Sequence, residues 1–168
     1  VLSEAPFLLR TPNDRANDSR GGGIAVQVLR VETADGSAVD LASVGSRFIE
    51  AMEKLRAGVL ENDGLNRLVL GAGLGWREVT LLRAYSKYLR QAGVPFSQDY
   101  MERTLAAYPA IAHALVDLFL VRFDPALGAA QSDVRKSSSQ AIEAAIAKSL
   151  EGVTTLDEDR ILRRFLNA

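Results

Sequence analysis

Residues 67–85 read RLVLGAGLGWREVTLLRAY, in which three apolar residues lead into Gly71, Gly73 and Gly75 and a helical pattern follows. A dinucleotide-binding loop needs a complete strand before it and a third glycine three residues after the second. That third position is Trp76, whose bulky indole would block a close approach, and no phosphate-loop lysine follows. The pattern therefore favours a helix, a glycine-containing turn and a second helix over a nucleotide-binding loop.

The chain beyond this turn alternates between helical periodicity and helix-ending residues. Ser97 can cap a helix, Pro109 forces a boundary, and the helix after it is apolar on most sides, so we expect that helix to be central and buried. A later helix carries its apolar residues as one stripe of Ile142, Ala145, Ile146 and Leu150. The predicted helices are a short one from about residue 62, then 77–91, 97–108, 110–123, 133–152 and 157 to the end.

The amino-terminal part has a different pattern. Residues 7–10 and 24–31 read as short strands around a polar, glycine-rich loop, and Asp40 can cap a helix that runs to about Ala57. The predicted fold is mainly α, with a small incomplete α+β unit over residues 1–58 followed by a multi-helix domain over residues 62–168. Two strands make a marginal sheet, and the chain opens on Val1 and closes on a helix without a stop signal, so we expect a piece of a larger protein.

Composition excludes several classes of protein. Lys and Arg total 20 against 21 Asp and Glu, so the net charge of -1 gives no overall attraction to nucleic acid or anionic lipid. Without cysteine and with His113 as the single histidine, the sequence offers no disulfide framework and little for zinc. The apolar runs are too short to span a bilayer, and no secretory segment opens the chain, so a cytoplasmic location is expected.

Three charged groups could be mistaken for sites. Arg83, Lys87 and Arg90 share one helix side, which fits a solvated or partner-facing surface better than a recognition helix, although a stand-alone helix-turn-helix nucleic-acid-binding protein remains the alternative. His113 and Asp117 are spaced as a surface pair, without a legible nucleophile nearby. The acidic residues at 157–159 suit the first turn of a helix and need no metal.

Several motifs carry a resemblance to a known family. NRLVL (66–70), WREV (76–79), LLRAY (81–85), RFDP (122–125) and LDEDRILRR (156–164) occur in the order and at about the spacing found in the large bacterial NAD-dependent glutamate dehydrogenases. The likeness covers nearly everything from Asn62 to the end. Residues 1–7, VLSEAPF, residues 35–41, DGSAVDL, and the helix after them resemble, more loosely, the close of an ACT-like regulatory unit of those enzymes.

The resemblance implies a role for the parent chain and another for this segment. The parent enzyme would convert L-glutamate to 2-oxoglutarate and ammonia with NAD as cofactor. The segment would lie immediately before the catalytic domain, hold no catalytic, cofactor-binding or metal-binding residue, and serve regulation and assembly. Its partners would be the catalytic domain of the same chain and sister subunits of a homo-oligomer. The candidate interdomain contacts are Asn66, Arg67, Trp76, Arg77 and Glu78.

Overall fold

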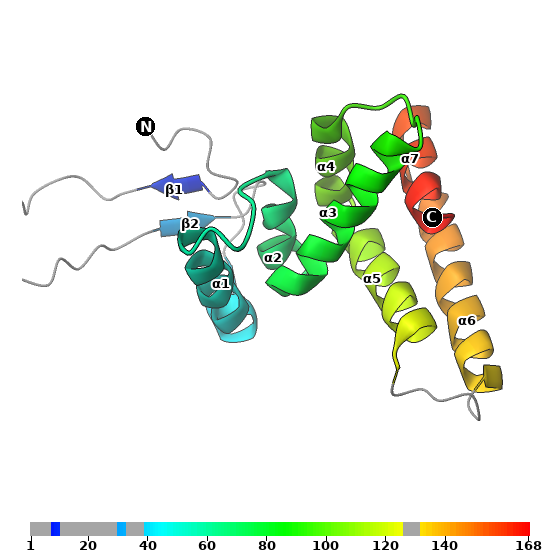
Figure 1. Cartoon of the computed structure of the whole chain (residues 1–168), viewed down its shortest axis with the longest axis horizontal. Coiled ribbons are helices and arrows are strands. Elements are labelled where there is room, and N and C mark those ends of the chain that lie inside the picture. The colour runs from blue at the N-terminus through cyan, green and yellow to red at the C-terminus, as the bar shows by residue number, and fades with distance from the viewer. Residues whose placement is uncertain (1–7, 11–29, 33–38, 126–131) are drawn as a thin grey trace, which may run out of the picture.

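The computed structural model describes residues 8–10, 30–32, 39–125 and 132–168. Helices dominate, as the sequence predicts, and most of them pack into one body (Figure 1). Their bounds are α1 Leu41–Arg56, the 3-10 helix η1 Gly64–Arg67, α2 Leu68–Gly71, α3 Trp76–Gln91, α4 Gln98–Ala107, α5 Pro109–Phe123, α6 Ser132–Leu150 and α7 Leu156–Leu166.

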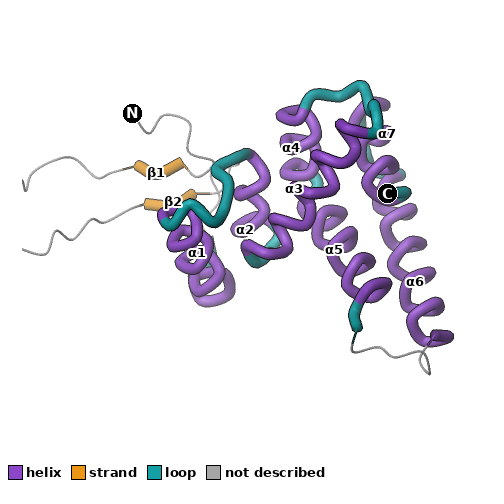
Figure 2. The backbone as a smooth tube through the Cα atoms, viewed as in Figure 1, coloured by secondary structure: helices purple, strands orange, loops and turns teal. Residues whose placement is uncertain are grey.

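Two short strands precede the helices. β1 (Leu8–Arg10) pairs with β2 (Arg30–Glu32) in antiparallel register, with Leu9 opposite Val31 (Figure 2). Both lie where the sequence predicts strands, although β2 ends one residue later than expected. The rest of the second predicted strand, residues 24–29, and the polar loop at 13–23 lie outside the described residues, as does the turn at 34–36.

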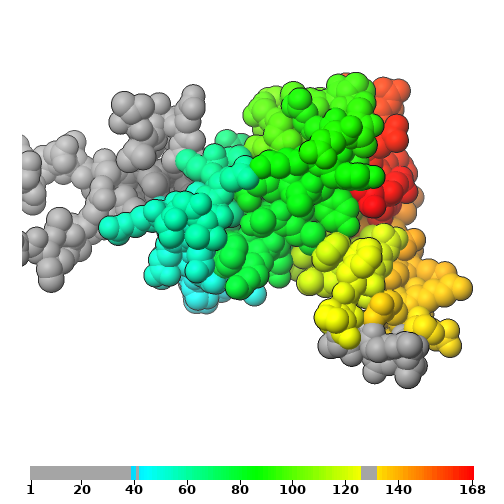
Figure 3. Space-filling view, in the orientation of Figure 1, coloured from blue at the N-terminus to red at the C-terminus, as the bar shows by residue number. Residues whose placement is uncertain are grey.

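Helix α1 packs against the helical body. Its N-cap is Asp40, as predicted, whose side chain accepts a hydrogen bond from the Ala42 backbone N–H at 3.0 Å. Ala51 is fully buried and belongs to the same hydrophobic core as the later helices, against which Phe48 and Met52 also pack. In the space-filling view α1 lies directly against the segments that follow it (Figure 3). The helix that follows the strands is thus a part of the helical core.

The glycine-containing turn connects two helices, as the sequence predicts. Leu68 and Val69 are fully buried in α2, so the apolar run that could be mistaken for a strand is helical. Gly73 has φ +65°, a left-handed conformation that favours glycine, and Leu74 turns back into the core with 1% exposure. The element that leads directly into the glycines is α2 and not a strand, which removes the geometric basis for a dinucleotide-binding loop.

The junction of α4 and α5 follows from proline and capping chemistry. Ser97 caps α4 by accepting the Tyr100 N–H at 3.1 Å, and Pro109 takes the first position of α5, where no backbone N–H is needed. The prediction that α5 is buried on most sides is correct only for its first turns. Leu120 is 46% and Phe123 62% exposed, because this end of α5 extends beyond α3 and α4 and packs chiefly along α6 (Figure 1).

The last two helices complete the core. Ile146 and Leu150 of α6 are buried as predicted, but Ala145 is exposed, because α6 covers the body with a narrower face than its apolar stripe indicates. Thr155 caps α7 by accepting the Glu158 N–H at 3.3 Å, so α7 begins at Leu156, one residue before the predicted start. The buried residues of α7 are Ile161, Leu162 and Phe165.

Candidate functional site

A buried polar network lies where the segment before α2 meets α3. Arg83 of α3 is only 3% exposed, and its guanidinium donates to both carboxylate oxygens of Asp63, with Nη2 2.9 Å from Oδ1. Nη2 also donates to Asn66 Oδ1 at 3.0 Å. Asn66 is fully buried and its amide donates to the Glu61 carbonyl at 2.9 Å. A buried charge needs a partner of opposite charge and full hydrogen bonding, and this network supplies both.

A second buried carboxylate fixes the same segment from α4. Glu102 is 7% exposed and accepts the Gly64 backbone N–H at 2.9 Å and the Gln98 side-chain amide at 3.0 Å. Asp63 caps η1 by accepting the Leu65 N–H at 3.0 Å. The segment before α2 is therefore held by α3 on one side and by α4 on the other.

Replacing Gly64 with alanine should destabilise this segment. A Cβ at this position would lie 3.0 Å from Glu102 Oε2 and 3.3 Å from Glu102 Cβ, which is closer than such atoms pack without adjustment. Because Glu102 is held by two hydrogen bonds, we expect a loss of about 1–3 kcal/mol in the free energy of unfolding. Urea denaturation measures this loss of stability. Gly58→Ala cannot serve as the control, because Gly58 has φ +70°, a left-handed conformation that any side chain would strain. Gly152→Ala, whose Cβ would meet only the Ser149 carbonyl at 3.6 Å, is the matched control.

Trp76 joins α3 to α1. Its indole N–H donates to Glu50 Oε1 at 2.8 Å, and the guanidinium carbon of Arg77 lies 4.5 Å from the ring centroid. The Lys54 ammonium of α1 lies 5.5 Å from the same centroid. Both cations are within the range of cation–π attraction. The half-buried indole thus fixes the start of α3 to the carboxyl-terminal half of α1.

The five predicted contact residues have different surroundings. Asn66 is fully buried in the network described above, and Glu78 accepts the Gly75 N–H at 2.6 Å, which satisfies the backbone donor of the N-cap residue of α3. Arg67 and Arg77 are exposed, and Trp76 is half-buried. Arg67, Trp76, Arg77 and Glu78 therefore all keep some exposed surface, and Asn66 keeps none.

The predicted basic stripe does not exist as one surface. Arg83 is buried and bound to Asp63, while exposed Lys87 pairs with Glu61, its ammonium 2.8 Å from Oε2. Of the three cations only Arg90 lies on the surface without an ion partner among the described residues. The nucleic-acid alternative needs Arg83 to contact phosphate, and a guanidinium that is 3% exposed cannot take that role.

The other candidate groups have structural partners. His113 Nδ1 lies 2.8 Å from the Ala72 carbonyl, and its Nε2 lies 3.7 Å from Asp117, with both side chains half exposed, as predicted for a surface pair. Asp157 pairs with Arg160 and Asp159 with Arg163 inside α7. Among the residues described, no group of three His, Cys, Asp or Glu side chains could hold a metal ion.

The described helices were compared with the length and apolarity that a membrane-spanning helix needs. No single helix there is long and apolar enough to cross a bilayer. Helices α4 and α5 pass the length and composition test only as a pair, and they are bent by 100° at their junction.

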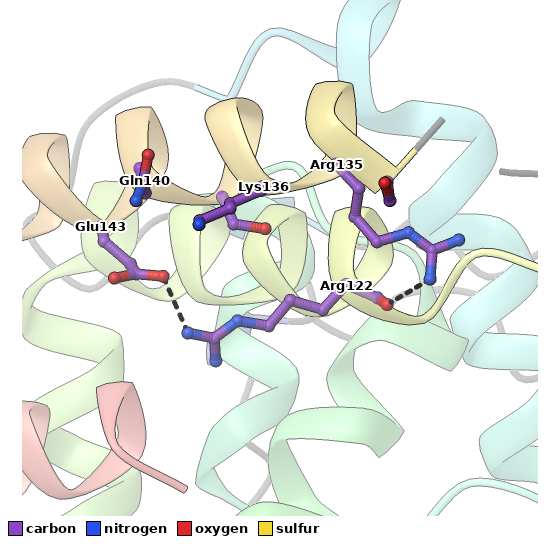
Figure 4. Close-up of a pocket in the computed structure, with 7 residues that line it drawn as sticks. Arg122, Arg135, Lys136, Gln140 and Glu143 are labelled. Carbon is purple, nitrogen blue, oxygen red and sulfur yellow. Dashed lines mark hydrogen bonds and ion pairs between the residues drawn. The ribbon is translucent and has the colours of Figure 1, made fainter. Parts of the chain in front are cut away.

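A polar pocket between α5 and α6 has no counterpart among the sites predicted from the sequence. It has a volume of about 440 Å³, and Figure 4 shows Arg122 reaching across to Glu143 while Arg135 reaches the backbone at the end of α5. Two of the three cations of α6 fall at residues 135 and 136, one or two turns before Gln140 and Glu143. That spacing puts these polar residues on one side of α6, which is the sequence signal that could have indicated the pocket.

Comparisons with known proteins point to one family. A family model described as "Glutamate dehydrogenase, helical motif 3" matches residues 60–125. The chain is 38% identical over 172 residues to the NAD-specific glutamate dehydrogenase of Mycobacterium tuberculosis, covering 98% of this chain and 10% of that protein. The enzymes of that name from Halomonas elongata and Pseudomonas aeruginosa are 41% and 38% identical over 76% and 99% of this chain, and it covers 8% and 10% of them. No solved structure matches.

Proposed function

Because this chain belongs to the family of large NAD-specific glutamate dehydrogenases, of whose length it spans about a tenth, we propose that it is a non-catalytic segment of such an enzyme. The parent protein would convert L-glutamate to 2-oxoglutarate and ammonia and pass the hydride to NAD. The observation that carries the proposal is identity of 38% over 98–99% of this chain to two relatives of that name. The segment itself would position the catalytic domain and regulate it.

The contacts of the described residues support a positioning role. The buried charges of Arg83 and Glu102 are used to fix one segment between α3 and α4, and Trp76 fixes α3 to α1. Groups held in this way stiffen a scaffold and are not available to react with a substrate. A rigid helical body is suited to hold neighbouring units of a large enzyme in a constant relation.

We also assign the two predicted domains on this basis. Residues 1–58 would be the close of an ACT-like unit and residues 62–168 the helical domain that leads into the catalytic domain. The order of two antiparallel strands followed by a helix is compatible with the first assignment. Helix α1 would then belong to both units, since it follows the strands and packs on α2 and α3.

The proposal is tested by measuring glutamate-dependent NAD reduction with this chain and with the full-length parent protein side by side. We expect activity in the parent protein alone. Saturating NAD should leave the melting temperature of this chain unchanged, since a ligand stabilises only a protein that binds it. A parent protein that is inert with glutamate, or NAD reduction by this chain alone, would refute the assignment.

The exposed candidates define a surface for contact with the catalytic domain or a sister subunit. Reversing both charges, Arg67→Glu with Arg77→Glu, should weaken assembly of the parent protein, because unlike charges across an interface would become like charges. We expect about a tenfold weaker association, or a comparable loss of glutamate oxidation, while the fold is kept. Sedimentation and kinetic assays measure both. The control is Arg90→Glu, an exposed position on α3; an equal effect of the control would remove these residues from the interface.

A further inference from the structure

An apolar groove lies where α3, α5 and α7 meet. Its floor is made of buried leucine and phenylalanine side chains from all three helices, and its rim of half-buried or exposed residues. Apart from one arginine, every lining side chain is apolar or aromatic. The floor residues are Leu82, Leu115, Leu118 and Phe165, and the rim residues are Tyr85, Phe119, Arg122, Leu166 and Ala168.

A row of aromatic rings extends the groove along α5. The Tyr85 and Phe119 rings meet edge to face with their centroids 6.0 Å apart, and the Phe123 ring follows with its centroid 4.8 Å from that of Phe119. Phe123 is 62% exposed. Single exposed apolar residues are common on protein surfaces, but apolar side chains that adjoin one another mark surfaces that bind a partner.

The depth and charge of the groove indicate what kind of partner fits. It encloses only about 10 Å³, roughly the room that one water molecule needs, whereas small-molecule sites have volumes of about 300–1,000 Å³. The only charged side chain on the rim, Arg122, already pairs with Glu143 at 2.9 Å. The groove is therefore suited to apolar side chains of a protein segment lying across it, and not to a small molecule or an anion.

The position of Ala168 favours one such segment. Ala168 lies on the rim, two residues after the last residue of α7. This inference rests on the proposed function, under which the parent protein continues beyond Ala168, as in relatives of which this chain covers 10%. A segment tethered this close to a site has an effective concentration of the order of millimolar. A sister subunit would instead lose translational and rotational freedom on binding there.

We propose that the apolar groove is the docking site of the segment of the parent protein that directly follows Ala168. Apolar side chains of that segment cover the Tyr85 and Phe119 rings and Leu166. The contact joins the end of α7 to α3 and α5, and it fixes the direction in which the parent chain leaves the helical body. The segment involved lies within about 30 residues of Ala168, the length of a connection and one helix.

The test is photo-cross-linking in the full-length parent protein. The photoreactive amino acid p-benzoylphenylalanine replaces Tyr85 in one variant and Phe119 in a second, so that each keeps an aromatic ring in the groove. The matched control carries it at Tyr88, which is 56% exposed on the same helix and does not line the groove. Mass spectrometry of the digested protein identifies the cross-linked peptides, and glutamate-dependent NAD reduction is measured on the same preparations.

We expect cross-links from positions 85 and 119 to peptides that directly follow Ala168, with a yield at least about tenfold higher than from position 88. Cross-links to a sister subunit or to a distant part of the parent chain would overturn the proposal, as would equal yields from positions 85 and 88 or no cross-link from either groove position. If the variant at Tyr85 does not fold, the one at Phe119 decides the outcome. A parent protein that is inert with glutamate refutes the proposed function, whereas an active one without these cross-links refutes the docking alone.

Discussion

Replacing Arg83 with methionine should lower the free energy of unfolding by about 3–5 kcal/mol, which is the usual cost of removing one partner from a buried ion pair. Methionine keeps much of the volume of the apolar stem but none of the donors. The Asp63 carboxylate would lose both of its bonds to the guanidinium, and buried Asn66 Oδ1 would lose its donor as well. Most of the loss in stability comes from these acceptors, which are left without a hydrogen-bond donor, and not from the lost attraction between Arg83 and Asp63 alone.

Urea denaturation followed by circular dichroism measures this loss. Arg90→Met is the control, since Arg90 is an exposed residue of the same helix and should change stability by less than about 0.5 kcal/mol. The double variant Asp63→Leu with Arg83→Met should recover part of the loss, because it removes the stranded carboxylate together with its cation. A loss below about 1 kcal/mol for Arg83→Met would show that the network contributes little.

Truncating Leu68 to alanine should cost about 2–5 kcal/mol, the range found for buried leucines. Leu68 is fully buried in α2, a helix of four residues that contacts η1, α1, α3, α4 and α5. So many neighbours cannot all move inward to fill the lost volume, so we expect most of the cavity to remain.

The same denaturation experiment checks this expectation. Leu156→Ala is the matched control, because Leu156 is 64% exposed at the start of α7 and should change stability by less than about 0.5 kcal/mol. Equal losses in the two variants would mean that α2 is not the centre of the packed body in solution.

The local features of the fold could be predicted from residue chemistry. Asp40, Ser97 and Pro109 mark the starts of α1, α4 and α5 because capping hydroxyls, carboxylates and proline act within one turn of the chain. The turn with Gly73 was predicted on the same local grounds. Such signals do not depend on distant parts of the molecule.

The features that were missed depend on residues far apart in the sequence. Arg83 was placed on a basic surface because its periodicity matches Lys87, but its partner Asp63 lies 20 positions earlier, and only the folded chain brings them together. Ala145 is exposed because other helices cover only a narrow side of α6, and the spacing of apolar residues does not predict how wide that side is. The polar pocket likewise needs Arg122 of α5 beside α6.

The packing of α1 has a consequence for the exchange of backbone amides with solvent. Because Ala51 lies in the same core as the later helices, α1 cannot open without uncovering the faces of α2 and α3 that it covers. Its central amides should therefore exchange as slowly as those of α3, in a single cooperative unit. A chain cut between residues 58 and 62 should lose protection from amide exchange in α2 as well. The residues on the two sides of the proposed domain boundary should therefore unfold together.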